Sequence, residues 1–209
     1  MNVNPNPSYL DLKKRANDEL SHPNASPRGD VQYIAYKLLI NDPRVVFLYG
    51  DSRTGKLHTA IAAGLVRLHR YVDAKNVNVS KKIVITYPDV AKRNLRDDSQ
   101  QCKNHIVNTL NSQLSSDVRL YLEKQSIIEI KSLTELKGEK LRDAYIILIQ
   151  GQNVTATDMY RFIMAYAPNG HQNKIAIIGD PRMRDLPDGY KSGLDYGISW
   201  LAPSVIGRE

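Results

Sequence analysis

The chain has 209 residues, 42% of them hydrophobic and 24% charged, which is typical of one globular domain, or of one domain with a terminal extension. A mean hydropathy of −0.42 and the lack of a long apolar run exclude a transmembrane helix, and the N-terminus lacks the pattern of a secretory signal. A single cysteine, Cys102, excludes an internal disulfide and a cysteine-based metal site, so we expect a cytoplasmic protein. The net charge of +7 is compatible with a nucleic-acid partner, and equally with a solvated basic surface.

The first 28 residues differ from the rest of the chain because they are rich in Asn, Pro and Ser. Residues 1–28 therefore predict an N-terminal extension that lies on the surface or orders against a partner, with a short helical stretch at 10–20. Residues 29–209 predict a single domain. Its first elements are a helix at 31–40, a β-branched and aromatic strand at 44–50 that ends in glycine, and a helix at 58–72.

The same alternation of helix and strand recurs in the second half of the chain. The strand candidates are 81–87, 126–130, 143–149 and 173–180, and the helical stretches between them are 89–125 and 156–167. The run at 143–149 is apolar enough to be buried on both faces, as a central parallel strand is. The alternation favours an α/β fold, with a mainly parallel sheet and helices on both faces.

The strongest local motif is GDSRTGK at Gly50–Lys56, which has the G-x-x-x-x-G-K spacing of a phosphate-binding loop between a strand and a helix. In such a loop the backbone N–H groups, the helix N-terminus and the lysine converge on phosphates. Leu57 stands where a Ser or Thr hydroxyl would bind magnesium, and Thr59 lies about 200° further round the helix. Asp51 places a negative charge inside the loop. Arg53 either offsets this charge or blocks the space in which a phosphate would bind.

Several motifs in order, from Gln32 to Leu194, resemble the PhoH family of P-loop ATPases, relatives of the motor core of superfamily-one helicases. The matching stretches are GDSRTGK, VITYPDV, IIEI, AYIILIQGQN, IIGD and KSGL. The resemblance implies a RecA-like P-loop fold, ring-like homo-oligomers and a bacterial or phage source. It also implies that Gln32 occupies a position where related ATPases read adenine, although an exposed helix residue is an equal interpretation.

The sequence departs from the family's pattern at the end of the fourth predicted strand. The family's Asp-Glu-Ala-Gln is replaced by Ile149, Gln150, Gly151 and Gln152. The aspartate helps to hold magnesium and the glutamate activates water, whereas isoleucine has no lone pair and glutamine accepts no proton. Further departures are Leu57 in the loop, Tyr87 in place of an arginine and Met183 in place of a glutamine. We therefore expect a pseudo-ATPase that requires no cofactor. Its loop is compatible with ATP binding, whereas the residues at the magnesium positions disfavour a magnesium ion.

Gln152 and Asp180 remain at strand ends, where ligands bind in such sheets, and we expect Asp180 to pair with Lys56. The predicted nucleotide-site residues are Gly50, Asp51, Ser52, Arg53, Thr54, Gly55, Lys56, Leu57, Gln32, Gln152 and Asp180. The five histidines show no metal-ligand spacing, so no metal site is predicted, and no histidine at a recognisable spacing suggests that Cys102 is a nucleophile.

Three functions stay open from the sequence. The first is a platform that binds a nucleotide, and RNA or another single-stranded nucleic acid, through basic residues. The candidates for nucleic-acid contact are Arg67, Arg70, Lys92, Arg93, Arg182, Arg184 and Lys191, each of which is also compatible with a solvated surface charge. The second function is a weak ATPase that depends on Lys56. The third is an oligomeric interaction subunit that assembles with itself, or docks on a host or partner protein through its N-terminus.

Overall fold

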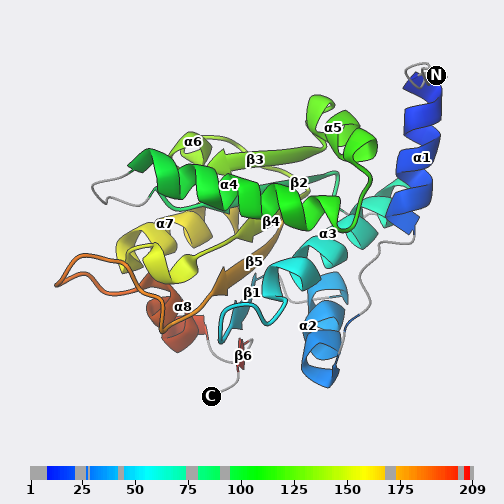
Figure 1. The fold of residues 1–209 in the computed structure, drawn as a ribbon. Helices are drawn as coiled ribbons and strands as arrows, with labels where there is room; N and C mark the ends of the chain where they lie inside the picture. The colour runs from blue at the N-terminus through cyan, green and yellow to red at the C-terminus, as the bar shows by residue number, and fades with distance from the viewer. Residues whose placement is uncertain are drawn as a thin grey trace.

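The computed structural model describes residues 9–21, 27, 29–41, 45–73, 80–89, 95–167, 173–201 and 205–207. Its strands form one sheet in the order β3-β2-β4-β5-β1-β6, and every neighbouring pair is parallel (Figure 1). The strands are β1 (Val45–Tyr49), β2 (Lys82–Tyr87), β3 (Ile128–Ser132), β4 (Ala144–Leu148), β5 (Lys174–Gly179) and β6 (Val205–Gly207). This confirms the predicted parallel α/β sheet, and the short edge strand β6 is an addition to it.

Helices cover both faces of the sheet, as expected for a RecA-like P-loop fold. They are α1 (Tyr9–Ser21), α2 (Asp30–Asn41), α3 (Lys56–Asp73), α4 (Leu95–Asn111), α5 (Ser116–Lys124), α6 (Leu133–Leu136), α7 (Ala156–Tyr166) and α8 (Gly193–Leu201), with a 3₁₀ turn, η1 (Gly151–Asn153). The helical stretch predicted at 89–125 contains α4 and α5, separated by a turn in which the N–H groups of Gln113 and Leu114 share the carbonyl of Leu110.

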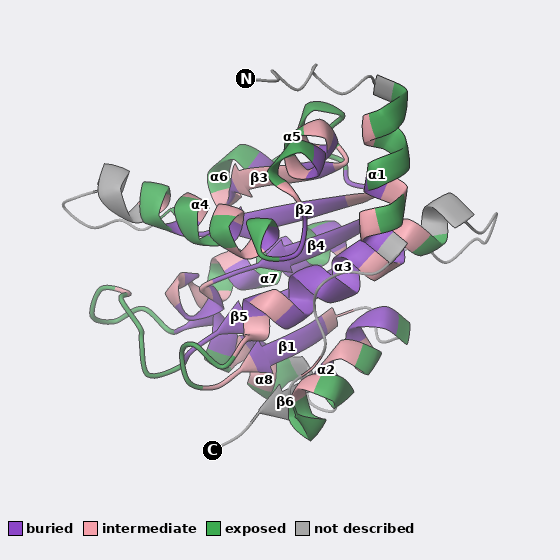
Figure 2. Cartoon of the chain, turned by 45° about the vertical axis from the view of Figure 1, so that its right-hand side comes forward, coloured by how far each residue is buried: buried purple, intermediate pink, exposed green. Residues whose placement is uncertain are grey.

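The core consists of two layers, one on each face of the sheet. One layer joins the sheet to buried side chains of α1 to α5, and the other joins it to α6, α7 and α8. All five residues of β4 are buried, which agrees with the apolar run that predicted a central strand. Figure 2 shows these buried strands between partly exposed helices. Among the described helices none is long and apolar enough to cross a membrane.

The helical part of the N-terminal extension packs on the domain. Ala16 and Leu20 of α1 are buried in the same layer as α3 and α5. The Glu19 carboxylate accepts hydrogen bonds from the Ser115 N–H and hydroxyl, both at 2.8 Å, just before α5 begins. Residues 1–8 and 22–26 lie outside the described residues.

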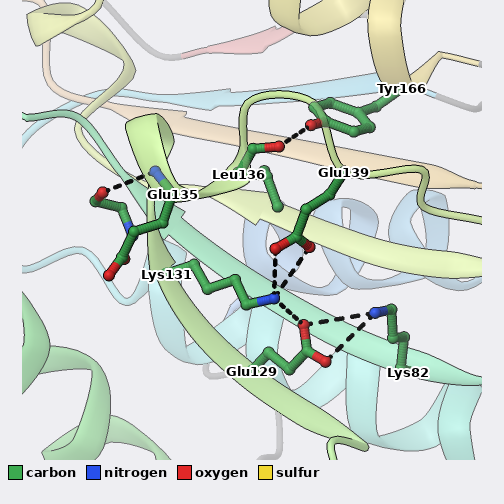
Figure 3. Close-up of polar contacts among 8 residues, drawn as sticks. Lys82, Glu129, Lys131, Glu135, Leu136, Glu139 and Tyr166 are labelled. Carbon is green, nitrogen blue, oxygen red and sulfur yellow. Dashed lines mark hydrogen bonds and ion pairs between the residues drawn. The ribbon is translucent and has the colours of Figure 1, made fainter.

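The edge strand β3 carries a chain of charged side chains on one face (Figure 3). The Lys131 ammonium lies 2.9 Å from Glu129 and 2.8 Å from Glu139, and Lys82 of the neighbouring β2 lies 3.4 Å from Glu129. The hydrogen bond to Glu139 raises the pKa of Lys131. Charges on an edge strand disfavour pairing with a further strand, so this cluster protects the sheet's edge.

Candidate nucleotide-binding site

The phosphate loop follows β1 and leads directly into α3, whose first residue is Lys56. The chain turns sharply here, with positive φ at Gly50 (137°), Arg53 (64°) and Gly55 (82°). Any side chain at Gly55 would also meet the Gln32 amide, because a Cβ would lie 3.0 Å from its nitrogen. The positive φ angles at Gly50 and Gly55 therefore explain why glycine stands at both positions. The N-terminus of α3 faces the cleft, as an anion-binding site requires.

The Lys56 side chain folds back over the loop. Its ammonium donates to the carbonyls of Gly50 (2.9 Å) and Asp51 (2.5 Å) and to the Thr54 hydroxyl (3.1 Å). Burial lowers the pKa of Lys56, although the nearby Asp180 and Asp51 carboxylates act in the opposite direction. The ammonium is thus held over the loop by two carbonyls and a hydroxyl of the loop itself.

Asp180, at the end of β5, fixes the loop from the other side. One carboxylate oxygen accepts the Ser52 N–H (2.7 Å) and hydroxyl (2.8 Å), and the other accepts the Arg182 N–H (3.0 Å). Burial raises the pKa of Asp180, but the Ser52 and Arg182 hydrogen bonds and the charge of Lys56 outweigh it and hold the pKa below its ordinary value. Asp180 is therefore hydrogen-bonded to Ser52 and to the Arg182 N–H, and the Lys56 ammonium, its predicted partner, acts on it through its nearby charge.

Gln152 and Gln32 support the same region from two further elements. The Gln152 side-chain oxygen accepts the Asp180 N–H at 3.1 Å, and its nitrogen donates to the Met183 carbonyl at 3.2 Å. The Gln32 amide, on α2, donates to the Thr54 carbonyl at 2.9 Å. The structure thus brings every predicted nucleotide-site residue to the loop or its immediate supports.

Leu57 and Ile149 occupy the positions at which the resemblance implies magnesium ligands. The two residues are 8% and 5% exposed; both belong to the core layer that includes α3 and α4, and both border the cleft. Ile149 also donates its N–H to the Thr86 carbonyl (2.9 Å), and Thr59 donates its hydroxyl to the Gly55 carbonyl (3.0 Å). Leucine and isoleucine offer no oxygen ligand, so these two positions do not fit magnesium in the manner that the resemblance implies.

A cleft of about 970 Å³ extends from the loop across the ends of β4 and β5 to α4. Its side on that helix and the first residue of the turn after it, the α4 wall, consists of Gln101, Cys102, His105, Asn108, Thr109 and Ser112. This wall is not among the sites predicted from the sequence. Its one signal is a polar stripe at helical spacing, which does not reveal what the helix faces.

The predicted nucleic-acid residues fall into different places. Arg67 is buried, and its guanidinium donates to the Ile40 carbonyl (2.6 Å) and the Ser80 hydroxyl (3.2 Å), so it serves the core rather than the surface. Arg70 is exposed near the far end of α3. Arg182, Arg184 and Lys191 lie on the exposed segment 181–191 beside the cleft, orange in Figure 1. Lys92 and Arg93 lie outside the described residues.

The parallel sheet and the loop at the end of β1 define a P-loop α/β domain. A family model described as "PhoH-like protein" matches residues 25–204, so the chain belongs to the PhoH family.

Proteins from two bacterial genera illustrate this relationship. The chain is 32% identical over 174 residues to a PhoH-like protein of Bacillus subtilis (strain 168), covering 79% of this chain and 50% of that protein. It is 26% identical over 189 residues to Protein PhoH2 of the same organism, covering 87% of this chain and 42% of that protein. A PhoH-like protein of Mycobacterium leprae (strain TN) is 28% identical over 165 residues, covering 75% of this chain and 44% of that protein. The chain thus spans about half the length, or less, of these curated relatives.

Proposed function

We propose that this PhoH-family domain binds the phosphates of a nucleotide on its loop without magnesium-dependent hydrolysis, as a pseudo-ATPase that keeps the fold as a binding platform. The observation that carries the proposal is the contrast within one cleft. The loop keeps the geometry and the lysine of an anion cradle, whereas packed apolar side chains stand at the positions for magnesium.

Phosphate binding is supported by the state of Lys56. Its ammonium already lies over the loop, held by two carbonyls and a hydroxyl that bind a cation less strongly than a phosphate does. The N-terminus of α3 adds the N–H groups of its first turn and the positive end of the helix dipole.

Loss of hydrolysis is supported by the end of β4. Phosphoryl transfer depends on positioning the nucleophile and neutralising charge, mostly through the metal and the residue that orients the water. Ile149 supplies no metal ligand, and Gln150 can orient a water but accepts no proton. Leu57 has no oxygen at the position after the loop lysine, where the resemblance implies a hydroxyl ligand.

The test compares phosphate release from ATP by the wild-type protein with release by Lys56→Ala, both purified in the same way. We expect the two rates to agree, because a domain that does not hydrolyse ATP leaves only phosphate released by a contaminant or by uncatalysed hydrolysis. Wild-type turnover clearly above that of Lys56→Ala would contradict the proposal and favour the alternative, a weak ATPase.

A second candidate function, contact with single-stranded nucleic acid, is favoured by the segment 181–191. It carries Arg182, Arg184 and Lys191 in exposed positions, and the Arg182 guanidinium lies 2.9 Å from Asp51 in the loop. Anisotropy of a labelled single-stranded RNA would test it, with all three residues changed to Ala. We expect weaker binding by the variant and a shallower dependence on salt. Equal binding by both proteins would contradict a role for this segment.

A further inference from the structure

The helix α1 lies outside the part of the chain that the family model matches, which begins at residue 25. It packs against α3 and α5 (Figure 1). Of its described side chains only Ala16 and Leu20 are buried. A helix attached through so little apolar surface opens locally more readily than the central strands do. Its polar contacts therefore contribute much of its attachment.

These polar contacts meet at the N-terminus of α5. Ser115 is the N-cap residue, with the extended backbone of that position (φ −63°, ψ 150°), yet its hydroxyl caps no N–H of α5. Its hydroxyl and its N–H both donate to the Glu19 carboxylate of α1 instead, each at 2.8 Å. In a capping box, a glutamate at the third helical position accepts the N-cap N–H, but that position is Val118 here. Glu19 therefore performs this part of the capping from a different helix.

Arg15 adds a weaker contact one turn before Glu19. Its guanidinium lies 3.6 Å from the Asp117 carboxylate in the first turn of α5 and donates to the Ser115 hydroxyl at 3.4 Å. The side chains of Arg15 and Asp117 are 44% and 60% exposed, so water and salt screen this ion pair. Glu19 is less exposed and accepts two short hydrogen bonds at a helix N-terminus, where the dipole favours its charge. Glu19 is therefore the main polar attachment of α1.

The turn at 112–115, between α4 and α5, connects this cap with the start of α3. Gln113 is buried in the turn, and its amide nitrogen donates to the His58 carbonyl at 2.9 Å. The Ser112 hydroxyl lies 3.5 Å from the His58 ring nitrogen Nδ1. His58 is in the first turn of α3, two residues after Lys56. The turn is thus bonded to α1 on one side and to the start of α3 on the other.

We infer that α1 is a strap: Glu19 fastens it to the turn at 112–115, and the docked strap keeps that turn against the start of α3. When α1 opens, the first turn of α3, which carries Lys56, becomes more mobile. Any partner that bound Ala16 and Leu20 would compete with the domain for these side chains and release the strap. The inference goes beyond the proposed function, because it involves no ligand.

The experiment measures hydrogen exchange of the ligand-free full chain, resolved by residue, for the wild type and three variants. Glu19→Ala removes the cap, and Gln113→Met removes the amide that bonds to His58 while keeping a long buried side chain. Glu123→Ala is the matched control, because 28% of the Glu123 side chain is exposed, against 27% for Glu19. The Glu123 carboxylate is bound to Arg119 of its own helix, at 2.6 Å.

A substitution speeds the exchange of an N–H group when the contact that it removes is broken in the opening that exposes this group. Glu19→Ala should therefore speed exchange about tenfold in α1 and at residues 59–62, since two hydrogen bonds to a charged group are lost. Glu123→Ala should leave both regions as in the wild type. Gln113→Met should speed exchange at residues 59–62 and leave α1 unchanged, because α1 opens first. The strand β4, which exchanges through global unfolding, should respond to all three variants.

Three results would overturn the inference. Exchange in α1 that Glu19→Ala left unchanged would show that Glu19 does not fasten the helix. Exchange at residues 59–62 that Glu19→Ala or Gln113→Met left unchanged would show that the start of α3 opens independently of the strap. Exchange at residues 59–62 that rose equally in Glu19→Ala and Glu123→Ala would show that this region opens through global unfolding.

Discussion

The ends of β1 and β4 open into the same cleft, yet they have opposite character. After β1 the chain forms a polar loop, held in shape by hydrogen bonds from Lys56 and by the bonds of Asp180 to Ser52. After β4 it continues with a buried isoleucine and with Gln150 in the left-handed region, at φ 52°. The loop is maintained by contacts that need no metal, whereas the end of β4 is maintained by packing.

The proposed function accordingly assigns phosphate binding to the loop and the loss of hydrolysis to the end of β4. The loop's supports, Asp180 and Gln152, are polar residues that remain useful without catalysis, because they hold backbone groups in place. At the end of β4, by contrast, Ile149 is part of the packed core layer. Substitutions at four positions test this contrast. Lys56 and Asp180 belong to the loop and its support, and Ile149 and Gln150 belong to the end of β4.

Ile149→Asp should destabilise the fold most, because it places a carboxylate in a core position that is 5% exposed. We expect the free energy of unfolding to fall by about 3 kcal/mol or more. Ile149→Val, which keeps the packing, should cost only about 1 kcal/mol. Urea denaturation of both variants measures this. If Ile149→Asp were as stable as Ile149→Val, the end of β4 would not be a packed site.

Lys56→Ala should reduce nucleotide affinity by about ten- to a hundredfold, because a charged hydrogen bond to phosphate is lost. Lys124→Ala removes an exposed lysine from the end of α5 and serves as the control for net charge. Calorimetric titration with ATP measures both. An equal loss in the two variants would mean that net charge, and not the loop, attracts the ligand.

Asp180→Asn should lower the free energy of unfolding by about 1–2 kcal/mol at neutral pH, since the bonds to Ser52 and Arg182 lose their charge. The Asp180 pKa is lowered in the folded state, so its contribution is complete above the unfolded pKa of about 3.9 and is lost as the pH falls through the folded pKa. The difference between wild type and variant should therefore shrink below about pH 4. A difference that stayed constant down to about pH 2 would contradict the assigned role of the carboxylate.

Gln150→Gly should have the smallest effect. It relieves a left-handed backbone conformation and should raise the free energy of unfolding by about 0.5–1 kcal/mol relative to Gln150→Ala, which keeps the strain. Neither variant should change nucleotide affinity. Thermal unfolding compares the two, and a less stable glycine variant would show that the conformation at residue 150 is not strained.

The sequence predicted those parts of the molecule that depend on local pattern. The runs around β1, β2, β4 and β5 are apolar over most of their length, and the glycines of the loop mark its turns, so the residue pattern alone was sufficient to place the sheet and the phosphate loop. Family resemblance added the order of the motifs and the significance of Ile149 and Leu57.

The rest depends on tertiary packing. Arg67 reads as a surface charge on an amphipathic helix, but the neighbouring Ile40 carbonyl and Ser80 hydroxyl need its donors. The α4 wall could not be predicted, because a polar stripe gives no information on which cleft a helix borders. Asp180 lies at the predicted strand end with the Lys56 charge nearby, but its hydrogen bonds to Ser52 could not be predicted, since they depend on the turn geometry of the loop.

Whether phosphate binding is independent of a metal can be decided by titrating the protein with a fluorescent ATP analogue, in magnesium and again in EDTA. We predict binding that depends on Lys56 and whose dissociation constant agrees within about twofold between the two conditions, because Ile149 and Leu57 offer no oxygen ligand at the positions where the resemblance implies the metal. Binding that magnesium tightens by about tenfold or more, and that Lys56→Ala abolishes, would show that a metal site survives and would contradict the separation of phosphate binding from hydrolysis.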